Sequence, residues 1–239
     1  MKKLIGFDLD GTLSQHKSPM DLASRSVLDD LRAGGWDLVM VCAGQCGRVY
    51  SQMGGYPVDI LGNYGMQRTT VDGSGNLVTV WDKSAPCDRE SVSSRIAALR
   101  DRFGLDSFTG DGVEFHPSGC VTFPILGTGA ELADKLRFDP DRVKRRKMLP
   151  DVIKAFPEYT VFVGGTSSFD MAPRPYDKWY ALKIYMQEKG IGQDDIVFAG
   201  DDWGPGGNDE SVYRSGAKFI CIDDYRRLRQ ILTAEKILN

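Results

Sequence analysis

Two carboxylates stand two residues apart where an apolar run near the N-terminus ends. Residues 4–9 are Leu-Ile-Gly-Phe-Asp-Leu, and Asp10-Gly11-Thr12 follows, which predicts a buried strand ending in a turn. Side chains two apart on a strand share a face, so Asp8 and Asp10 point to the same side. Where a metal and a lysine neutralise phosphoryl oxygens, one carboxylate can attack phosphorus and the other can protonate the leaving oxygen. This interpretation makes Asp8 the nucleophile and Asp10 the general acid and base.

More carboxylates follow a later apolar run, over residues 196–199, and the glycine-rich loop after it. The carboxyl ends of parallel strands face one crevice, where such sheets bind ligands. The carboxylates after the N-terminal run and those after the run at 196–199 would then lie close together. Each like-charge pair at ~4 Å costs about 4 kcal/mol at an effective dielectric near 20, so a cation must lie among them. Oxygen ligands without histidine or cysteine favour Mg²⁺. The predicted magnesium ligands are Asp8, Asp10, Asp201 and Asp209, and the expected protein cation is Lys178, at the start of a helix.

The hydrophobic spacing around these residues predicts an α/β fold. Strand, helix, strand, helix in the first 55 residues indicates a parallel sheet with right-handed crossovers, and the same layout returns near the C-terminus. The expected strands lie at 4–9, 36–42, 196–199 and 218–222, and the expected helices at 21–33, after Gly44 and at 178–189.

The middle of the chain has a different pattern, with a hairpin-like turn at residues 72–75 and short strands beside a basic helix. This pattern predicts an antiparallel α+β insert. We therefore expect a core domain formed by 1–83 and 175–239, and an inserted domain, 84–174, that selects the substrate. The elements expected in the insert are helices at 88–103 and 140–156 and strands at 113–115, 120–125 and 160–163.

The motifs resemble those of the haloacid dehalogenase (HAD) superfamily. Residues 7–13, Phe-Asp-Leu-Asp-Gly-Thr-Leu, resemble its first motif, Lys178 its third, and Gly200-Asp201 with Asp209 its fourth. Residues 167–170, 176–178 and 205–210 are similar to the eukaryotic-type phosphomannomutases, close to the sugar-phosphate phosphatases. The resemblance implies a Rossmann-like core, a C2-type α+β cap and a small phosphorylated substrate. It also implies that Ser168 and Asp170 hold sugar hydroxyls.

The sequence departs from this family at its phosphate-binding positions. His116, and Thr128 or a neighbour of it, stand where the resembling mutases have arginines that clamp a second phosphate, a task suited to the bidentate guanidinium. Their loss favours a phosphatase over a mutase. Arg174, next to the hinge, is our candidate replacement; basic residues over 137–147 are another source of charge, although a basic helix is more often a solvated face.

The superfamily's second motif, a Ser or Thr after the second strand, is also missing, because Ala43 or Gly44 stands there. Backbone N–H groups of Gly44 and Gln45 at a helix start are expected to bind the phosphoryl group instead.

We expect Mg²⁺-dependent hydrolysis of a sugar phosphate or similar small phosphate monoester through an aspartyl-phosphate. A hexose phosphate mutase and a non-catalytic sugar-phosphate-binding module are the alternatives. The composition argues against disorder and nucleic-acid binding, with 30 basic and 33 acidic residues, a net charge of −3 and 41% hydrophobic residues. The N-terminal apolar run is too short for a signal peptide or membrane span, and five scattered cysteines indicate reduced thiols, so a cytoplasmic location is expected. Monomer and homodimer remain open.

Overall fold

The computed structural model describes residues 3–238, and they form two compact units. The first, here called the core unit, runs to Asp82 and continues over Asp177–Gly204 and from Asp209 onward. The second, the cap unit, comprises Lys83–Tyr176 and Pro205–Asn208. No helix within residues 3–238 combines the length and apolar character needed to cross a bilayer.

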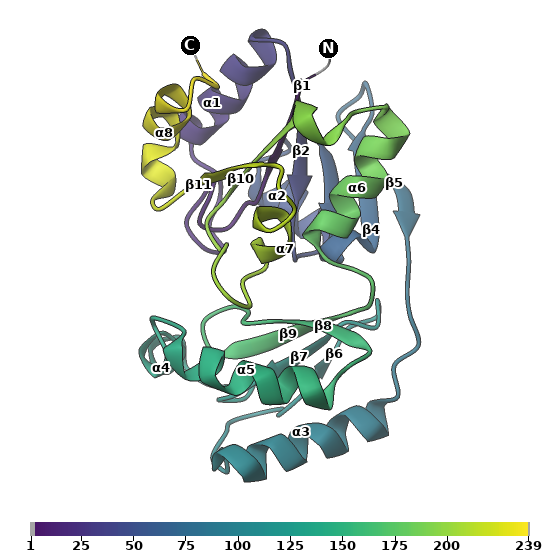
Figure 1. The fold of residues 1–239 in the computed structure, drawn as a ribbon, viewed down its shortest axis with the longest axis vertical. Helices are drawn as coiled ribbons and strands as arrows, with labels where there is room; N and C mark the ends of the chain where they lie inside the picture. The colour runs from purple at the N-terminus through teal and green to yellow at the C-terminus, as the bar shows by residue number, and fades with distance from the viewer. Residues whose placement is uncertain (1–2, 239) are drawn as a thin grey trace. The chain divides into compact units, whose positions relative to one another are not determined.

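The core unit is built on a seven-stranded sheet in the order β11-β10-β1-β2-β3-β4-β5 (Figure 1). The five strands from β11 to β3 are parallel, whereas β4 and β5 form an antiparallel hairpin at one edge. The central strands are almost entirely buried, as expected for parallel strands covered on both faces. The strands are β1 (Lys3–Phe7), β2 (Trp36–Val41), β3 (Asp59–Gly62), β4 (Gln67–Val71), β5 (Leu77–Asp82), β10 (Ile196–Gly200) and β11 (Lys218–Cys221).

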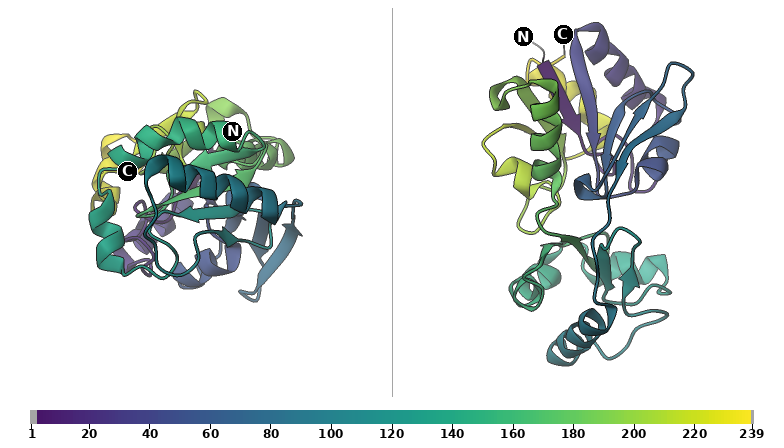
Figure 2. Two further views of the ribbon diagram at one scale, coloured as in Figure 1. Left: turned by 90° about the horizontal axis from the view of Figure 1, so that it is seen from below. Right: turned by 90° about the vertical axis from the view of Figure 1, so that its right-hand side faces the viewer.

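Helices cover both faces of this sheet (Figure 2). On α1, Val27, Leu28 and Leu31 form the buried stripe, and Asp21 caps the helix by accepting from the Ser24 amide. One face carries α1 (Leu22–Ala33), α2 (Cys46–Gln52) and α8 (Leu228–Ala234), and the other carries α6 (Lys178–Lys189) and α7 (Glu210–Tyr213). Short 3₁₀ turns occur at Asn63–Gly65, Gln193–Asp195 and Tyr225–Arg227.

The cap unit has a four-stranded antiparallel sheet in the order β6-β7-β9-β8. Phe123 and Phe169, with ring centroids 6.0 Å apart, join its core with residues of α3 and α5. Because side chains alternate along a strand, Ser168 and Asp170 lie on the opposite face from Phe169 and Met171. The elements are α3 (Arg89–Phe103), β6 (Glu114–Phe115), β7 (Val121–Pro124), α4 (Leu132–Phe138), α5 (Val143–Ala155), β8 (Tyr159–Phe162) and β9 (Ser168–Pro173). The predicted α/β class, a parallel-rich core sheet with an inserted α+β unit, is confirmed.

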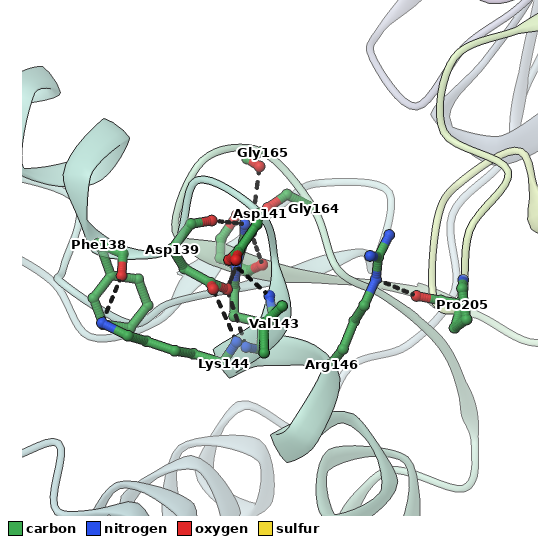
Figure 3. Close-up of polar contacts among 11 residues, drawn as sticks. Phe138, Asp139, Asp141, Val143, Lys144, Arg146, Gly164, Gly165 and Pro205 are labelled. Atoms are coloured by element: carbon green, nitrogen blue, oxygen red, sulfur yellow. Dashed lines mark hydrogen bonds and ion pairs between the residues drawn. The ribbon is translucent and has the colours of Figure 1, made fainter. Parts of the chain in front are cut away.

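Residues 205–208 belong to the cap unit, whereas the sequence prediction assigns them to the core. The Val163 amide donates to the Gly206 carbonyl at 2.8 Å, and Arg146 Nε donates to the Pro205 carbonyl at 3.2 Å (Figure 3). A β-carbon at Gly206 would lie 2.6 Å from the Leu149 side chain. Glycine at 206 therefore allows this loop to pack closely against the cap.

A buried ion pair organises the start of α5. Arg145 is 1% exposed, and its Nε donates to Oδ2 of Asp139 at 2.9 Å. Its Nη1 donates to the Gly164 carbonyl at 2.6 Å and to the Ser168 carbonyl at 3.2 Å. Asp139 also accepts from the amides of Arg145 and Lys144 (Figure 3). The guanidinium is therefore committed to holding the 164–168 turn, and Arg145 is not a replacement phosphate clamp.

Candidate active site

The nucleophile candidate lies where β1 ends. The Asp8 amide donates to the Ala199 carbonyl at 3.0 Å, which extends the pairing of β1 with its parallel neighbour β10. Asp201 follows the end of β10, so parallel pairing brings both carboxylates to the same edge of the sheet. The Thr12 hydroxyl in the turn after β1 is buried and has no hydrogen-bond partner among the residues that the structure describes.

The loop after β10 is closed by Asp209. Its Oδ2 accepts from the Asp202 amide at 3.0 Å, and its own amide donates to the Asp202 carbonyl at 3.0 Å. These reciprocal bonds fix Asp209 beside the strand ends although seven residues lie between it and Asp201.

Lys178 lies between two of the carboxylates. It is the first residue of α6, whose N-cap, Asp177, accepts from the Tyr180 amide at 2.7 Å. The Lys178 side chain is 0% exposed, and its Nζ lies 2.8 Å from Oδ1 of Asp8 and 2.7 Å from Oδ1 of Asp209. Burial alone would lower the pKa of Lys178, but the charges of Asp209 and Asp8 outweigh it and raise the pKa. The ammonium is thus held charged beside Asp8, the nucleophile candidate.

The carboxylates of Asp8, Asp201 and Asp209, here called the acidic cluster, offer oxygens that all lie within 4.8 Å of one another. Burial, followed by the charges of neighbouring carboxylates, raises the pKa of Asp201 to about 8. Burial is also the main cause that raises the pKa of Asp8 to about 6, against the opposing charge of Lys178. Within residues 3–238 we find no hydrogen bond to the Asp201 carboxylate. An oxygen-only cluster with an unpartnered carboxylate fits a hard divalent cation such as Mg²⁺.

Glycine at position 11 is required by this packing. Gly11 has a φ of +93°, and a β-carbon there would lie 2.4 Å from Oδ2 of Asp201. The turn after β1 can therefore pass under the Asp201 carboxylate only without a side chain.

The carboxylate of Asp10 lies outside the acidic cluster, and its expected role as a metal ligand stays a prediction. Its Oδ1 accepts from Gln52 Nε2 and from the Lys17 amide, both at 2.7 Å, and its Oδ2 lies 3.4 Å from the Arg48 guanidinium. Burial would raise the pKa of Asp10, but the hydrogen bonds from Gln52 and Lys17 and the charge of Arg48 lower it overall. These contacts orient the Asp10 carboxylate, two residues after Asp8.

Gly44 and Gln45, expected to bind phosphate through backbone N–H groups, precede α2. The Gly44 carbonyl accepts from the Asn63 amide, and Gln45 is the N-cap without a side-chain bond. The amide of Cys46, the first helical residue, already donates to Gln67 Oε1 at 2.8 Å. Sequence reasoning missed Arg48, whose guanidinium lies beside Gly44. Its spacing of four residues from Gln52, on one helix face, is the only available signal.

The cap unit holds the candidate sugar-binding residues. The Thr122 hydroxyl donates to Oδ1 of Asp170 at 3.0 Å and lies 3.0 Å from Nε2 of His116. Because Thr122 has one hydroxyl hydrogen and gives it to Asp170, Nε2 of His116 is the donor in the second bond. The Ser168 hydroxyl donates to the Gly164 carbonyl at 3.2 Å.

Arg174 is not brought beside Ser168 and Asp170. It follows the far end of β9, and its Nε donates to the carbonyls of Pro157 at 2.9 Å and Tyr159 at 3.1 Å. No contact supports its expected role in binding substrate.

The amino-acid sequence is similar to those of known phosphomannomutases. The sequence profile described as "Eukaryotic phosphomannomutase" matches residues 107–225. The chain is 25% identical over 256 residues to a phosphomannomutase of Encephalitozoon cuniculi, covering 97% of this chain and 94% of the relative. It is 33% identical over 109 residues to that of Schizosaccharomyces pombe, covering 44% of this chain and 41% of the relative.

Solved structures with the same fold include a sugar phosphatase and an IMP-nucleotidase. The HAD subclass IIB sugar phosphatase BT4131 superposes with a TM-score of 0.63 at 14% identity, covering 99% of this chain and 100% of that one. An IMP-nucleotidase of Plasmodium falciparum superposes with a TM-score of 0.70 at 12% identity, covering 99% of this chain and 68% of that one. The chain thus shares its fold with HAD-superfamily proteins of known structure, and its sequence is similar to those of the eukaryotic phosphomannomutases.

Proposed function

We propose that this protein is a Mg²⁺-dependent phosphatase that hydrolyses a sugar phosphate or a similar small phosphate monoester through an aspartyl-phosphate on Asp8. The observation that carries the proposal is the position of Lys178 Nζ, 2.8 Å from Asp8 and 2.7 Å from Asp209, beside the free carboxylate of Asp201. Such a site can neutralise phosphoryl oxygens next to a carboxylate nucleophile.

The proposed reaction has two balanced halves. A carboxylate oxygen of Asp8 forms a bond to phosphorus while the ester P–O bond breaks, and the leaving oxygen takes a proton from Asp10. A water molecule then attacks phosphorus, gives a proton to Asp10, and releases inorganic phosphate and the Asp8 carboxylate. Mg²⁺ bound by the acidic cluster would supply charge neutralisation at the phosphoryl oxygens. Lys178 holds the nucleophile in place throughout.

Several contacts in the cap unit support hydrolysis over mutase chemistry. His116 is hydrogen-bonded to the neutral Thr122 hydroxyl, and Thr128 Oγ1 accepts from the Asp111 amide at 2.9 Å. The guanidinium groups of Arg145 and Arg174 bond to cap backbone carbonyls. A mutase must hold a bisphosphate by both ends between its two half-reactions, and these positions offer it no spare bidentate clamp.

A single incubation tests the proposal. Mannose 1-phosphate and Mg²⁺ are supplied with and without glucose 1,6-bisphosphate, and both inorganic phosphate and mannose 6-phosphate are measured. We expect Mg²⁺-dependent release of phosphate that needs no bisphosphate and disappears in Asp8→Asn, a substitution that keeps the shape of the side chain. Phosphate release that survives Asp8→Asn would contradict the assignment of the nucleophile.

The similarity to phosphomannomutases favours a second candidate, a hexose phosphate mutase. In that case mannose 6-phosphate accumulates faster than free phosphate, and glucose 1,6-bisphosphate strongly increases its rate. A non-catalytic sugar-phosphate-binding module would bind the sugar phosphate and yield neither product.

A further inference from the structure

A phosphoryl group entering the site meets more negative than positive charge. The carboxylates of Asp8, Asp10, Asp201 and Asp209 lie near the ends of β1 and β10, and Lys178 is the ammonium bound between two of them. The phosphoryl dianion adds to this excess, and one divalent cation does not remove it. A further protein cation beside the nucleophile would lower the cost of binding the substrate.

Arg48 presents a guanidinium at this place. Its Nη1 and Nη2 both lie 3.4 Å from Oδ2 of Asp10, longer than the ~2.7–2.9 Å of a tight charge-assisted hydrogen bond. Gln52 Oε1 accepts from Nη1 at 2.7 Å and orients the group. Among the described residues, Nη2 has no closer partner than Asp10. The side chain is 43% exposed, so it can donate to an anion that enters from solvent.

The space that Arg48 uses exists because residue 44 is glycine. A β-carbon at Gly44 would lie 2.2 Å from Nη2 of Arg48. Residues 43 and 44 are also where the sequence lacks the hydroxyl of the superfamily's second motif. The Arg48 guanidinium can therefore lie at this position only because residue 44 has no side chain.

We propose that Arg48 is a catalytic residue that binds an oxygen of the transferred phosphoryl group, in place of the hydroxyl that positions 43 and 44 lack. This inference rests on the proposed phosphatase function. Arg48 contacts the phosphoryl group of the phosphate monoester before the reaction and inorganic phosphate after it. The planar guanidinium suits this task because two of its N–H groups can face neighbouring phosphoryl oxygens.

Arg48→Ala is the first test, with Gln52→Leu and Arg226→Ala as comparators. We expect Arg48→Ala to lower kcat/KM by about 10- to 100-fold and to weaken competitive inhibition by inorganic phosphate by at least about 5-fold. Gln52→Leu removes the 2.7 Å hydrogen bonds to both Asp10 and Arg48 but keeps the guanidinium, so it should lower kcat and weaken phosphate inhibition clearly less than Arg48→Ala does. Arg226, whose side chain pairs with Asp224 on the surface, should be replaceable without effect.

A second experiment asks whether a hydroxyl at position 44 can do the work of Arg48. Gly44→Ser alone should lower activity, because the new side chain displaces the guanidinium. In the Arg48→Ala background the same substitution should raise kcat/KM several-fold and restore phosphate inhibition. This reversal of sign is expected only if both groups serve one phosphoryl oxygen.

The outcomes separate this inference from the proposed function. If wild type neither turns over phosphate monoesters nor binds inorganic phosphate with Mg²⁺, both proposals are overturned. If wild type is active and depends on Asp8 but Arg48→Ala keeps its affinity for phosphate, only the role of Arg48 is overturned. In that case a loss of kcat alone would show that Arg48 merely orients Asp10. Loss of phosphate affinity in Arg48→Ala with recovery by Gly44→Ser supports the proposal.

Discussion

Replacing Asp201 by asparagine should stabilise the metal-free protein. The oxygens of the acidic cluster lie within 4.8 Å of one another, and two full charges at that separation repel by about 3–4 kcal/mol at an effective dielectric near 20. Folding raises the pKa of Asp201 to about 8 from its ordinary value of 3.8. Below pH 4 the carboxyl group is protonated in both the folded and the unfolded state, so its raised pKa does not change the free energy of unfolding. As the pH rises from 4 toward 8, the raised pKa lowers the free energy of unfolding progressively.

Asp201→Asn removes this cost while keeping the side-chain shape. At pH 7.5, in EDTA, we expect the free energy of unfolding to rise by about 2–4 kcal/mol relative to wild type, and at pH 4 we expect almost no difference. Urea unfolding followed by circular dichroism measures both. The control is Asp194→Asn, which removes the same charge from an exposed turn before β10 and should change little at either pH.

Added Mg²⁺ should reduce the difference in free energy of unfolding between wild type and Asp201→Asn. At a hundred times its Kd, a ligand that binds only the folded protein stabilises it by about 2.7 kcal/mol, and wild type should gain this much while Asp201→Asn gains clearly less. The reasoning is refuted if Asp201→Asn is less stable than wild type in EDTA at pH 7.5. It is also refuted if Mg²⁺ stabilises both proteins equally.

Two further substitutions probe the buried cations. Arg145→Met leaves the Asp139 carboxylate, 0% exposed, with only backbone amides as partners. Urea unfolding at pH 7 should therefore show that the free energy of unfolding falls by about 3–5 kcal/mol. Because folding lowers the pKa of Asp139, this loss should shrink as the pH falls below 4. Lys178→Met leaves Asp8 facing Asp209 without the ammonium between them, so kcat should fall at least about 100-fold. The melting temperature in EDTA should fall more at pH 8 than at pH 5, because Asp8 of the wild type, with a pKa of about 6, is largely protonated at pH 5.

Local pattern was sufficient to predict four strands of the core unit but not β3. Apolar runs bounded by glycine and aspartate specified β1, β2 and β10, and the helix predicted over 178–189 is α6 at the same bounds. The carboxylates of Asp8 and Asp201 follow neighbouring parallel strands, so the rule that such strands end at one edge was enough to bring them together. Asp209 was predicted from its position after the glycine-rich loop and Lys178 from its position at the start of a helix, although both are distant in sequence from Asp8.

What the sequence could not predict depends on contacts between distant residues. β9 was missed because Ser-Phe-Asp-Met-Ala-Pro has little of the branched-residue pattern of strands, and its pairing with β7 and β8 supplies the order. Arg145 has the same sequence context as the exposed basic residues around it, so only the fold distinguishes the buried one. Arg48 appears important only once Gly44 is seen beneath its guanidinium.

The departures from the resembling mutases change where positive charge is placed, and this bears on the reaction. In the cap unit, His116 stands where the resembling mutases have a guanidinium. It donates to the neutral Thr122 hydroxyl, which in turn donates to Asp170. An imidazole and a hydroxyl in this arrangement suit sugar hydroxyls rather than a second phosphate. At the core position a hydroxyl is lost and Arg48 takes its place. Charge is thus removed where a bisphosphate would need it and added beside the nucleophile. An enzyme with this distribution should hold one phosphoryl group tightly and release its dephosphorylated partner readily, so that water, rather than a returning sugar, accepts the phosphoryl group.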